Sequence, residues 1–427
     1  MRIVTHIVMV AACFLVAAGP HAYPLDGSEE TGISRLEAFD LARESLLASG
    51  RLKPGALGTT EQVRPRLADQ PGFTLPAADP KLNAALREFV GADASKYGIA
   101  ILDLSDPAAP RYGELNPGMV QNPASVGKIM VALAFFQALA DVYPDDVEAR
   151  QRVLRDTVVT ANDFIIKDSH DVPIWKPGDP KVVSRPIQLG DQGNLYTYFD
   201  WMFSVSSSAA ASMIQEQMLL LLHFGTGYPA SPEASRAYIE NTPKAQLGSA
   251  FMGAMRRSIE GNGLDWNKLR QGSFFTRTGK AKVPGTNSIA TAGQLLLLLT
   301  RLEQGKLIDS WSSLMIKRLL YHTDRRTRYA SSPILNDSAV YFKSGSLYGC
   351  KEEAGFVCGK FMGNRMNYMN SVIIVEEEKD GRSLHYIVAL VSNVLKKNSA
   401  VEHQTLGTRI HRWIQRAHEP VAAEAPE

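Results

Sequence analysis

Net charge, histidine clusters and cysteine are all scarce in this sequence. Its 427 residues include 46 lysines and arginines and 44 aspartates and glutamates, so the formal net charge is only +2. Binding to nucleic acid relies on a strongly basic surface, and this balance gives such a function no support. The nine histidines are scattered, without an HExxH or C2H2 spacing. We therefore expect no metal site and no cofactor.

Long hydrophobic runs are lacking beyond the N-terminus. Met1-Arg2 and the apolar stretch Ile3–Gly19, followed by small residues up to Ala22, have the layout of a secretory signal peptide. The stretch that ends at Cys13 resembles a bacterial lipoprotein box. Because the apolar run continues beyond that cysteine, we favour cleavage near Ala22 over lipid attachment. The sequence thus predicts a secreted or periplasmic protein with no membrane span in the mature chain.

Removal of this signal leaves two cysteines, Cys350 and Cys358. A close pair of cysteines in an exported chain predicts a disulfide, with two unpaired thiols as the alternative. Neither a third cysteine nor a histidine lies near them in the sequence, so a metal site at this pair is not expected.

Composition predicts four regions. Residues 1–22 are the signal peptide, and 23–79 form an N-terminal extension with a helix at 33–50 and a Pro/Gly-rich linker. Residues 80–417 form the main domain, and 418–427 a disordered tail. Within the main domain, strands at both ends of the chain enclose a helical stretch, which predicts an antiparallel sheet with a helical insert. The expected strands are 98–104, 111–115, 340–346 and a hairpin over 369–394 with its turn at Asp380-Gly381; the expected helices include 125–141, 198–222, 244–260, 290–304, 310–321 and 399–418.

The first candidate for chemistry is Ser125 with Lys128, at the start of an apolar helix. Residues three apart share a helix face, and a serine at a helix start lies among free N–H groups at the positive end of the dipole. A neutral lysine amine within reach could take the hydroxyl proton and make the serine a nucleophile. This motif alone leaves open the alternative of a serine N-cap beside a solvated lysine.

Two further clusters lie later in the chain. Ser206-Ser207-Ser208 falls in an apolar helical stretch, although serine is a mediocre former of helix interiors. Lys343-Ser344-Gly345 falls on a strand, where the glycine would let an extended substrate lie along the edge. Helix caps or a tight helix crossing would also explain the serines, and an ordinary surface strand would explain the lysine.

The three clusters resemble, in their order and spacing, the motifs of the penicillin-recognising serine enzymes, the serine β-lactamases and the D-alanyl-D-alanine peptidases. The resemblance covers about residues 80–417 and is closest to the class A β-lactamases. It implies an α+β fold, an α/β sandwich, in which a five-stranded antiparallel sheet with flanking helices stands beside an all-helical subdomain. Arg277-Thr278-Gly279 also matches the third motif, but only Lys343 is followed by a hairpin and a last helix.

The resemblance implies catalytic roles for four residues. Ser125 would be the nucleophile, Lys128 its base or base organiser, and Ser206 the proton donor to the leaving nitrogen. Lys343 would hold the substrate carboxylate and tune the site. The reaction would proceed through an acyl-serine.

The same resemblance implies substrate contacts for the neighbouring residues. Ser344 would help to hold the carboxylate, and Ser208 and Gly345 would contact the substrate. The backbone N–H groups of Ser125 and Ser346 would form an oxyanion hole.

Departures from the family pattern shape the expected function. Ser208 stands where the family has asparagine and Ser207 where it has aspartate. Class A β-lactamases deacylate with the glutamate of a Glu-x-x-Leu-Asn motif, whereas residues 261–302 contain one acidic residue, Asp265, and no glutamate. We therefore expect an exported serine hydrolase that is acylated by β-lactams or related amides and deacylates slowly.

Two alternatives to this function stay open. One is a D-alanyl-D-alanine carboxypeptidase or penicillin-binding protein that acts on peptidoglycan peptides, and the other is a non-catalytic module that binds penicillin or wall peptides. In each case the expected partner is a small-molecule or peptide substrate, with no nucleic acid, and the protein is expected to be a monomer.

Overall fold

The computed structural model describes residues 26–419, apart from 45, 48–58, 323–325 and 380. The expected signal peptide with Cys13, the expected helix end at Gly50, Asp380 of the hairpin turn and most of the expected tail lie outside the described residues. The last helix ends at Ala417, one residue before the predicted end.

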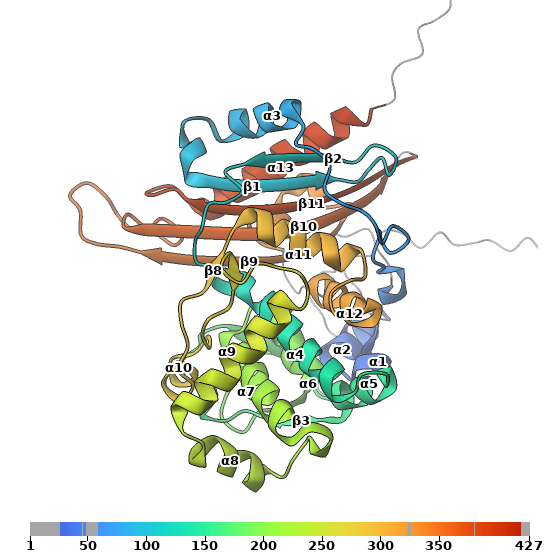
Figure 1. Cartoon of the computed structure of the whole chain (residues 1–427), viewed down its shortest axis with the longest axis vertical. Helices are drawn as coiled ribbons and strands as arrows, with labels where there is room; N and C mark the ends of the chain where they lie inside the picture. Colours follow the sequence, from blue (N-terminus) through green and yellow to red (C-terminus); the bar gives the residue numbers. More distant parts are fainter. Residues whose placement is uncertain (1–25, 45, 48–58, 323–325, 380, 420–427) are drawn as a thin grey trace, which may run out of the picture.

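A five-stranded antiparallel sheet forms the upper layer of the molecule (Figure 1). The first two strands and the last three build it together, as the sequence predicts, in the order β2-β1-β11-β10-β9. Strand β9 therefore lies at an edge, and among the described residues no strand pairs with its outer side. The strands are β1 (Tyr97–Asp103), β2 (Arg111–Leu115), β9 (Ala339–Gly349), β10 (Met366–Lys379) and β11 (Arg382–Asn393).

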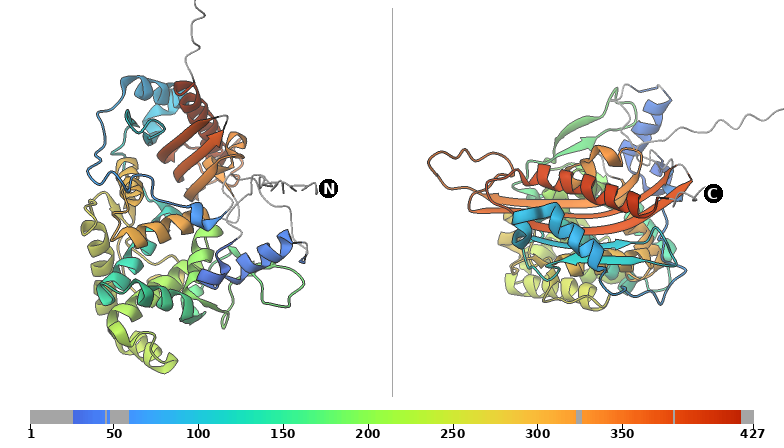
Figure 2. Two further views of the ribbon diagram at one scale, coloured as in Figure 1. Left: turned by 90° about the vertical axis from the view of Figure 1, so that its right-hand side faces the viewer. Right: turned by 90° about the horizontal axis from the view of Figure 1, so that it is seen from above.

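The two faces of this sheet are buried in different cores. Helices α3 (Pro80–Val90) and α13 (Ser399–Ala417) cover one face, and the helical part of the chain lies against the other (Figure 2). Because side chains alternate along a strand, Val340 and Phe342 of β9 face the α13 core while Tyr341 faces the helical core. The same alternation directs Lys343 toward the helical side.

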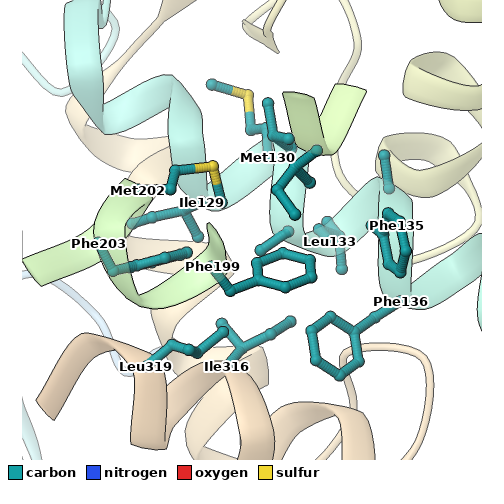
Figure 3. Packing of buried hydrophobic residues seen from close by; sticks show 14 of the residues in the cluster. Ile129, Met130, Leu133, Phe135, Phe136, Phe199, Met202, Phe203, Ile316 and Leu319 are labelled. Carbon is teal, nitrogen blue, oxygen red and sulfur yellow. The ribbon is translucent and has the colours of Figure 1, made fainter. Parts of the chain in front are cut away.

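Helix α4 (Gly127–Val142) runs through the centre of the helical part. Together with the turn before it, over Ala124–Val142, it is long and apolar enough to cross a membrane by length and composition, but 72% of its most apolar stretch is buried inside the protein. Its side chains Ile129, Leu133 and Phe136 pack against α6 and α12 (Figure 3). The surrounding helices are α5 (Val147–Asp156), α6 (Leu195–Ser204), α7 (Ser208–Phe224), α8 (Pro232–Asn241), α9 (Lys244–Glu260), α10 (Arg277–Lys282), α11 (Ala292–Glu303) and α12 (Ser310–Tyr321).

The predicted helices over 244–260 and 310–321 are confirmed at both ends, and Thr291 caps α11 as expected. The single helix predicted over 198–222 is wrong, because the chain breaks between α6 and α7 at residues 205–207. Ser207 caps α7 by accepting a hydrogen bond from the Ala210 N–H, and Ser206 adopts a left-handed φ of 66°. Serine side chains that bond to local backbone favour such a break over a continuous helix.

Short elements occupy the stretch over 156–198, which the sequence predicts to be rich in loops. They form two-stranded ribbons that connect α5 to α6. A further ribbon follows α9. The strands are β3 (Val158–Thr160), β4 (Asp171–Ile174), β5 (Val183–Pro186), β6 (Gln192–Asn194), β7 (Leu269–Arg270) and β8 (Ile289–Ala290).

The described part of the N-terminal extension packs into the main body. Its helices are α1 (Ser28–Thr31) and α2 (Ser34–Arg43). The guanidinium of Arg35 forms a two-pronged ion pair with the carboxylate of Asp200 on α6, at 2.5 Å, and both side chains are buried. Leu36 and Leu67 belong to the same core as α4. These contacts join the extension to the helix that leads into Ser206.

Candidate active site

All three predicted motifs meet at the boundary between the sheet and the helical part. Ser125 lies in a 3₁₀ turn (Ala124–Val126) that directly precedes α4, so the α-helix begins two residues later than the sequence predicts. Ser206 lies in the break between α6 and α7, and Lys343 lies on β9. The left-handed backbone of Ser206 costs roughly 1–3 kcal/mol, and strain of this kind persists where the surroundings impose a conformation.

Lys128 connects the first two motifs. Its Nζ lies 2.9 Å from the Oγ of Ser125 and 2.7 Å from the carbonyl oxygen of Ser206. The hydroxyls of Ser206 and Ser208 follow at 3.3 and 3.4 Å. One amine thus reaches the hydroxyls of the predicted nucleophile and of the predicted proton donor.

Burial sets the protonation of Lys128, whose side chain has no exposed surface. Desolvation is the largest influence and lowers its pKa, the negative charge of Asp168 raises it, and the positive charge of Arg328 lowers it again. The net result is a pKa of about 7, against an ordinary value of 10.5. A large fraction of Lys128 is therefore neutral near pH 7 and able to accept a proton.

Lys343 approaches Ser206 from the sheet. Its Nζ lies 2.8 Å from the Ser206 Oγ and 3.3 Å from the carbonyl oxygen of Ser344. Burial, followed by the positive charges of Lys128 and Arg328, lowers the pKa of Lys343 well below its ordinary value. The Ser206 hydroxyl is consequently in contact with both lysines, which gives it a path for proton transfer.

Gly345 allows β9 to approach the nucleophile. A Cβ at this position would lie 2.5 Å from the backbone nitrogen of Ser125, 2.6 Å from the Pro123 oxygen and 2.8 Å from the Val126 nitrogen. Only glycine permits this contact between strand and turn. It brings the outer edge of β9, which continues with Ser346, next to the N–H of Ser125 where an oxyanion would be stabilised.

Arg328, which the sequence analysis missed, adds a cation on the other face of β9. Its guanidinium donates hydrogen bonds to the hydroxyls of Ser344 and Ser346, the latter at 3.1 Å. Ser344 is predicted to help hold the substrate carboxylate, and Ser346 is predicted to contact the substrate through its backbone N–H. A guanidinium beside two hydroxyls on an edge strand is well suited to bind a carboxylate. Arg328 precedes the lysine motif by 15 positions in the sequence, and no local pattern marks it.

Asp168 is a second residue that the sequence analysis missed. One oxygen of its carboxylate accepts hydrogen bonds from the Ser207 hydroxyl at 2.9 Å and from the N–H groups of Ser208 and Ala209 at 2.6 and 2.8 Å. The other oxygen contacts His170. Burial acts to raise the pKa of Asp168, but His170 and these donors outweigh it and hold the pKa well below its ordinary value. A carboxylate from another loop thus braces the serine segment, where the family has an aspartate within its own motif.

The side of α4 beside Lys128 carries an amide and an aromatic ring. Gln271 packs directly against Gly127, and the Phe275 ring centre lies 4.7 Å from the Lys128 Nζ. Asp265, the one acidic residue of 261–302, forms an ion pair with Lys268 at 3.4 Å and accepts a hydrogen bond from the Asn267 N–H. The Asp265 carboxylate is therefore bound within its own turn. Of residues 261–302, the two described beside Gly127 and Lys128, Gln271 and Phe275, carry no carboxylate.

A cavity of about 530 Å³ opens beside these residues. Its lining is mixed, with apolar side chains from Ile165, Ile166, Ile187 and Phe275 beside polar ones from the same loop, and Ser208 connects it to Lys128. The lining residues are Ile165, Ile166, Lys167, Asp168, Ser169, Ile187, Ser208 and Phe275. An acyl group attached to Ser125 would have room for an apolar side chain here.

The competing motif Arg277-Thr278-Gly279 lies in α10 rather than on a strand. Thr278 bonds the Ile166 carbonyl through its N–H and its hydroxyl, so this segment anchors the cavity loop. Cys350 and Cys358 are joined as a disulfide in the connection between β9 and β10, with Cα atoms 6.2 Å apart.

One group of metal-ligand type occurs among the described residues. Glu303, Glu376 and His385 bring ligand atoms within 4.8 Å of one another. The buried ammonium of Lys317 lies 2.7 Å from an oxygen of each glutamate and also binds the Arg64 carbonyl. Lys317 therefore supplies the positive charge at this position, and the cluster connects α11, α12 and β10 with the N-terminal extension.

Comparison with known proteins finds one family model and many solved structures that match this chain. The model of the beta-lactamase enzyme family matches residues 250–396, a stretch that contains Lys343-Ser344-Gly345 but begins after Ser125 and Ser206. No curated protein sequence matches the chain.

Solved structures share the fold at low sequence identity. A mutant of PBP-A, in an acyl-enzyme complex with penicillin G, is 12% identical with a TM-score of 0.51, over 81% of this chain and all of the other. A beta-lactamase from Sphaerobacter thermophilus is 13% identical with a TM-score of 0.50, over 80% of this chain and 98% of its own. One from Chitinophaga pinensis is 16% identical with a TM-score of 0.50, over 79% and 100%.

The family match covers part of the chain, and the solved structures of PBP-A and of the beta-lactamases share its fold. The predicted fold class, an α+β sandwich with a five-stranded antiparallel sheet, is confirmed.

Proposed function

We propose that this chain is a serine acyl-transfer hydrolase that is acylated on Ser125 by β-lactams or related amides. The single observation that carries the proposal is Lys128, a fully buried amine with a pKa of about 7 that lies 2.9 Å from the Ser125 hydroxyl. A solvated lysine beside a helix cap would be exposed and protonated. A buried, largely neutral amine has the properties of a general base.

The contacts support a route for each proton. Lys128 takes the proton of Ser125 as the oxygen attacks the substrate carbonyl, and the oxyanion is stabilised by the N–H groups of Ser125 and Ser346. Ser206 gives its proton to the leaving nitrogen and is reprotonated by Lys128, whose Nζ lies 3.3 Å away. Lys343, at 2.8 Å, stabilises the developing charge on the Ser206 oxygen. The C–N bond breaks, and the acyl group stays on Ser125.

The substrate would carry a carboxylate on its leaving side. Arg328 places a guanidinium beside the hydroxyls of Ser344 and Ser346 on β9, which suits the carboxylate of a penicillin or of a peptide C-terminus. The amine of Lys343 lies next to them on the strand, toward Ser206. The cavity on the other side of Ser208 would accept the acyl side chain.

Release of the acyl group should be slow. Gln271 and Phe275 lie beside Gly127 and Lys128, and neither side chain can activate a water molecule as a carboxylate does. Slow release favours the behaviour of a penicillin-binding protein or D-alanyl-D-alanine peptidase over that of a fast class A β-lactamase. We also propose export, from the layout of residues 1–22 and the Cys350–Cys358 disulfide.

Labelling with a fluorescent penicillin tests the function. Wild-type protein should form a covalent adduct on Ser125 that persists for minutes or longer, and Ser125→Ala should form none. Hydrolysis of a penicillin at many turnovers per second would refute slow release of the acyl group, but it would be consistent with acylation of Ser125. Saturable, non-covalent binding in both proteins would instead identify a binding module.

A further inference from the structure

We propose that Phe361 is a positioning residue that holds Arg328 in place to recognise the substrate carboxylate. This inference rests on the proposed function of the site, and it concerns residues outside the three motifs. Its starting point is the contact between the two side chains: the guanidinium carbon of Arg328 lies 5.0 Å from the centre of the Phe361 ring. Arginine stacks on aromatic faces in this way, with an attraction between its charge and the ring electrons.

The backbone of Arg328 also indicates that its surroundings hold this residue in place, because its conformation is a rare one for a residue with a side chain. It has a left-handed φ of 56° at the start of a 3₁₀ turn (Arg328–Ser331), directly before the buried Tyr329. A non-glycine residue in this region persists only where its surroundings impose it. The hydrogen bonds to Ser344 and Ser346 account for the guanidinium nitrogens that face β9, and the Phe361 ring supports the guanidinium plane.

Phe361 is itself firmly placed. It also has a left-handed φ, at 62°. Its carbonyl oxygen accepts hydrogen bonds from the N–H of Ser399 at 3.0 Å and from the Ser399 hydroxyl at 3.2 Å, at the first turn of α13. The Tyr348 ring meets its edge with centroids 5.9 Å apart. Contacts from a helix and from the end of β9 thus fix an aromatic ring that no catalytic step uses.

The segment that carries Phe361 is longer than the connection requires. Strands β9 and β10 are adjacent and antiparallel, and two to five residues would join them. The chain uses residues 350–365 instead, and the connection projects beyond the end of the sheet (Figures 1 and 2). The Cys350–Cys358 disulfide closes it, and the Asn364 side chain bonds both the N–H and the carbonyl of Lys351 at 2.9 Å. We call this connection the stapled loop, because the disulfide and the hydrogen bonds of Asn364 restrict its conformation.

The groups proposed to bind the carboxylate therefore come from different segments of the chain. Lys343 and Ser344 belong to the strand, whereas the cation that faces Ser344 and Ser346 comes from a separate turn and is aligned by the stapled loop. If the ring is lost, the guanidinium keeps its charge but gains freedom, so binding of a carboxylate weakens while the bond-breaking groups around Ser125 stay in place.

The test compares acylation by a penicillin with acylation by its methyl ester, which lacks the carboxylate charge. For Phe361→Leu we expect the half-saturating concentration of the free acid to rise about fivefold to thirtyfold, with the limiting acylation rate within about twofold of wild type. The ester should be affected little. Phe361→Tyr, which keeps the ring, should restore wild-type values. Val357→Ser, at an exposed position of the same loop, serves as the matched control.

Several outcomes would overturn the inference. Equal losses with acid and ester would indicate a merely structural role, as would a fall in the limiting rate alone, and unchanged half-saturation would exclude any role. If wild-type protein is not acylated at all, the proposed function fails, and equilibrium binding of N-acetyl-D-alanine then tests the positioning alone. Weaker binding by Phe361→Leu than by wild type supports it, and equal binding or no saturable binding overturns it.

Discussion

The Nζ of Lys128 lies 2.9 Å from the Oγ of Ser125, and the lysine is completely buried. Because the pKa of Lys128 is about 7 and only its neutral form accepts a proton, the acylation rate at low substrate concentration should rise with pH through about 7. The reaction with a penicillin, measured from pH 5.5 to 9, checks this.

Two substitutions should move this midpoint in opposite directions. The negative charge of Asp168 raises the pKa of Lys128, so Asp168→Asn should lower the midpoint. The positive charge of Arg328 lowers that pKa, so Arg328→Gln should raise it. Asp265→Asn is the control, because Asp265 pairs with Lys268 and its charge is not among the main influences on the pKa of Lys128. Shifts of the same sign in both variants would contradict the assignment of Lys128 as the base.

Gly345→Ala should abolish the approach of β9 to the nucleophile. The new Cβ would meet three backbone atoms of the turn around Ser125 at 2.5 to 2.8 Å, and backbone cannot move aside as a flexible side chain can. A displacement of about 1 Å at a reacting group can cost on the order of a hundredfold in rate, so we expect at least that loss in acylation. Rapid-mixing measurements of adduct formation check it.

The matched control is Gly349→Ala, on the same strand, where an added Cβ would have nothing within 4 Å. It should acylate at nearly the wild-type rate. Wild-type acylation by Gly345→Ala would show that the contact between strand and turn is not needed.

Phe275→Glu should shorten the lifetime of the acyl-enzyme. The ring lies 4.7 Å from the Lys128 Nζ and lines the cavity, so a carboxylate in its place could activate a water molecule near the acyl group. Its negative charge should also raise the pKa of Lys128 and move acylation to higher pH. We expect deacylation to accelerate at least tenfold, measured as loss of fluorescent label after removal of free penicillin.

Phe275→Gln separates charge from the loss of the ring. It opens the same space without a base, so its acyl-enzyme should decay much more slowly than that of Phe275→Glu. Equal decay of the two variants would mean that water access, and not a missing base, limits release.

Glu216→Gln should stabilise the protein at high pH. Burial is the largest influence on Glu216 and raises its pKa to about 7, although hydrogen bonds from Asn162 oppose the shift. A raised folded-state pKa favours folding at low pH, and this contribution is lost as the pH rises from about 4.5 through about 7. At pH 8 the variant should gain on the order of 1–3 kcal/mol in the free energy of unfolding.

Urea unfolding at pH 5 and at pH 8 measures this difference. The variant and wild type should be close at pH 5, and Glu240→Gln, at an exposed position, should change little at either pH. A destabilised Glu216→Gln at pH 8 would indicate that the charged carboxylate is the form that the fold requires.

The sequence by itself determined the sheet and most of the long helices, and it singled out the three candidate motifs. Apolar runs on either side of Asp380-Gly381 mark β10 and β11, Thr291 marks the start of α11, and the run after Ser125 marks the central helix. Each of these signals is local. Order and spacing were also enough to choose Lys343 over Arg277-Thr278-Gly279 as the third motif.

Only the tertiary structure decided which side chains meet. Asp168 and Arg328 come from loops with no pattern of their own, and they reach Ser207 and Ser344 because packing brings separate segments together. Ser206 likewise contacts Lys128 and Lys343, and no local pattern at Ser206 contains these partners. The pKa of Lys128 also depends on the tertiary structure. A lysine can act as a base only when its pKa is lowered, and here burial beside Phe275 lowers it, the negative charge of Asp168 opposes this shift, and the positive charge of Arg328 lowers it again. All three of these residues are distant from Lys128 in the chain.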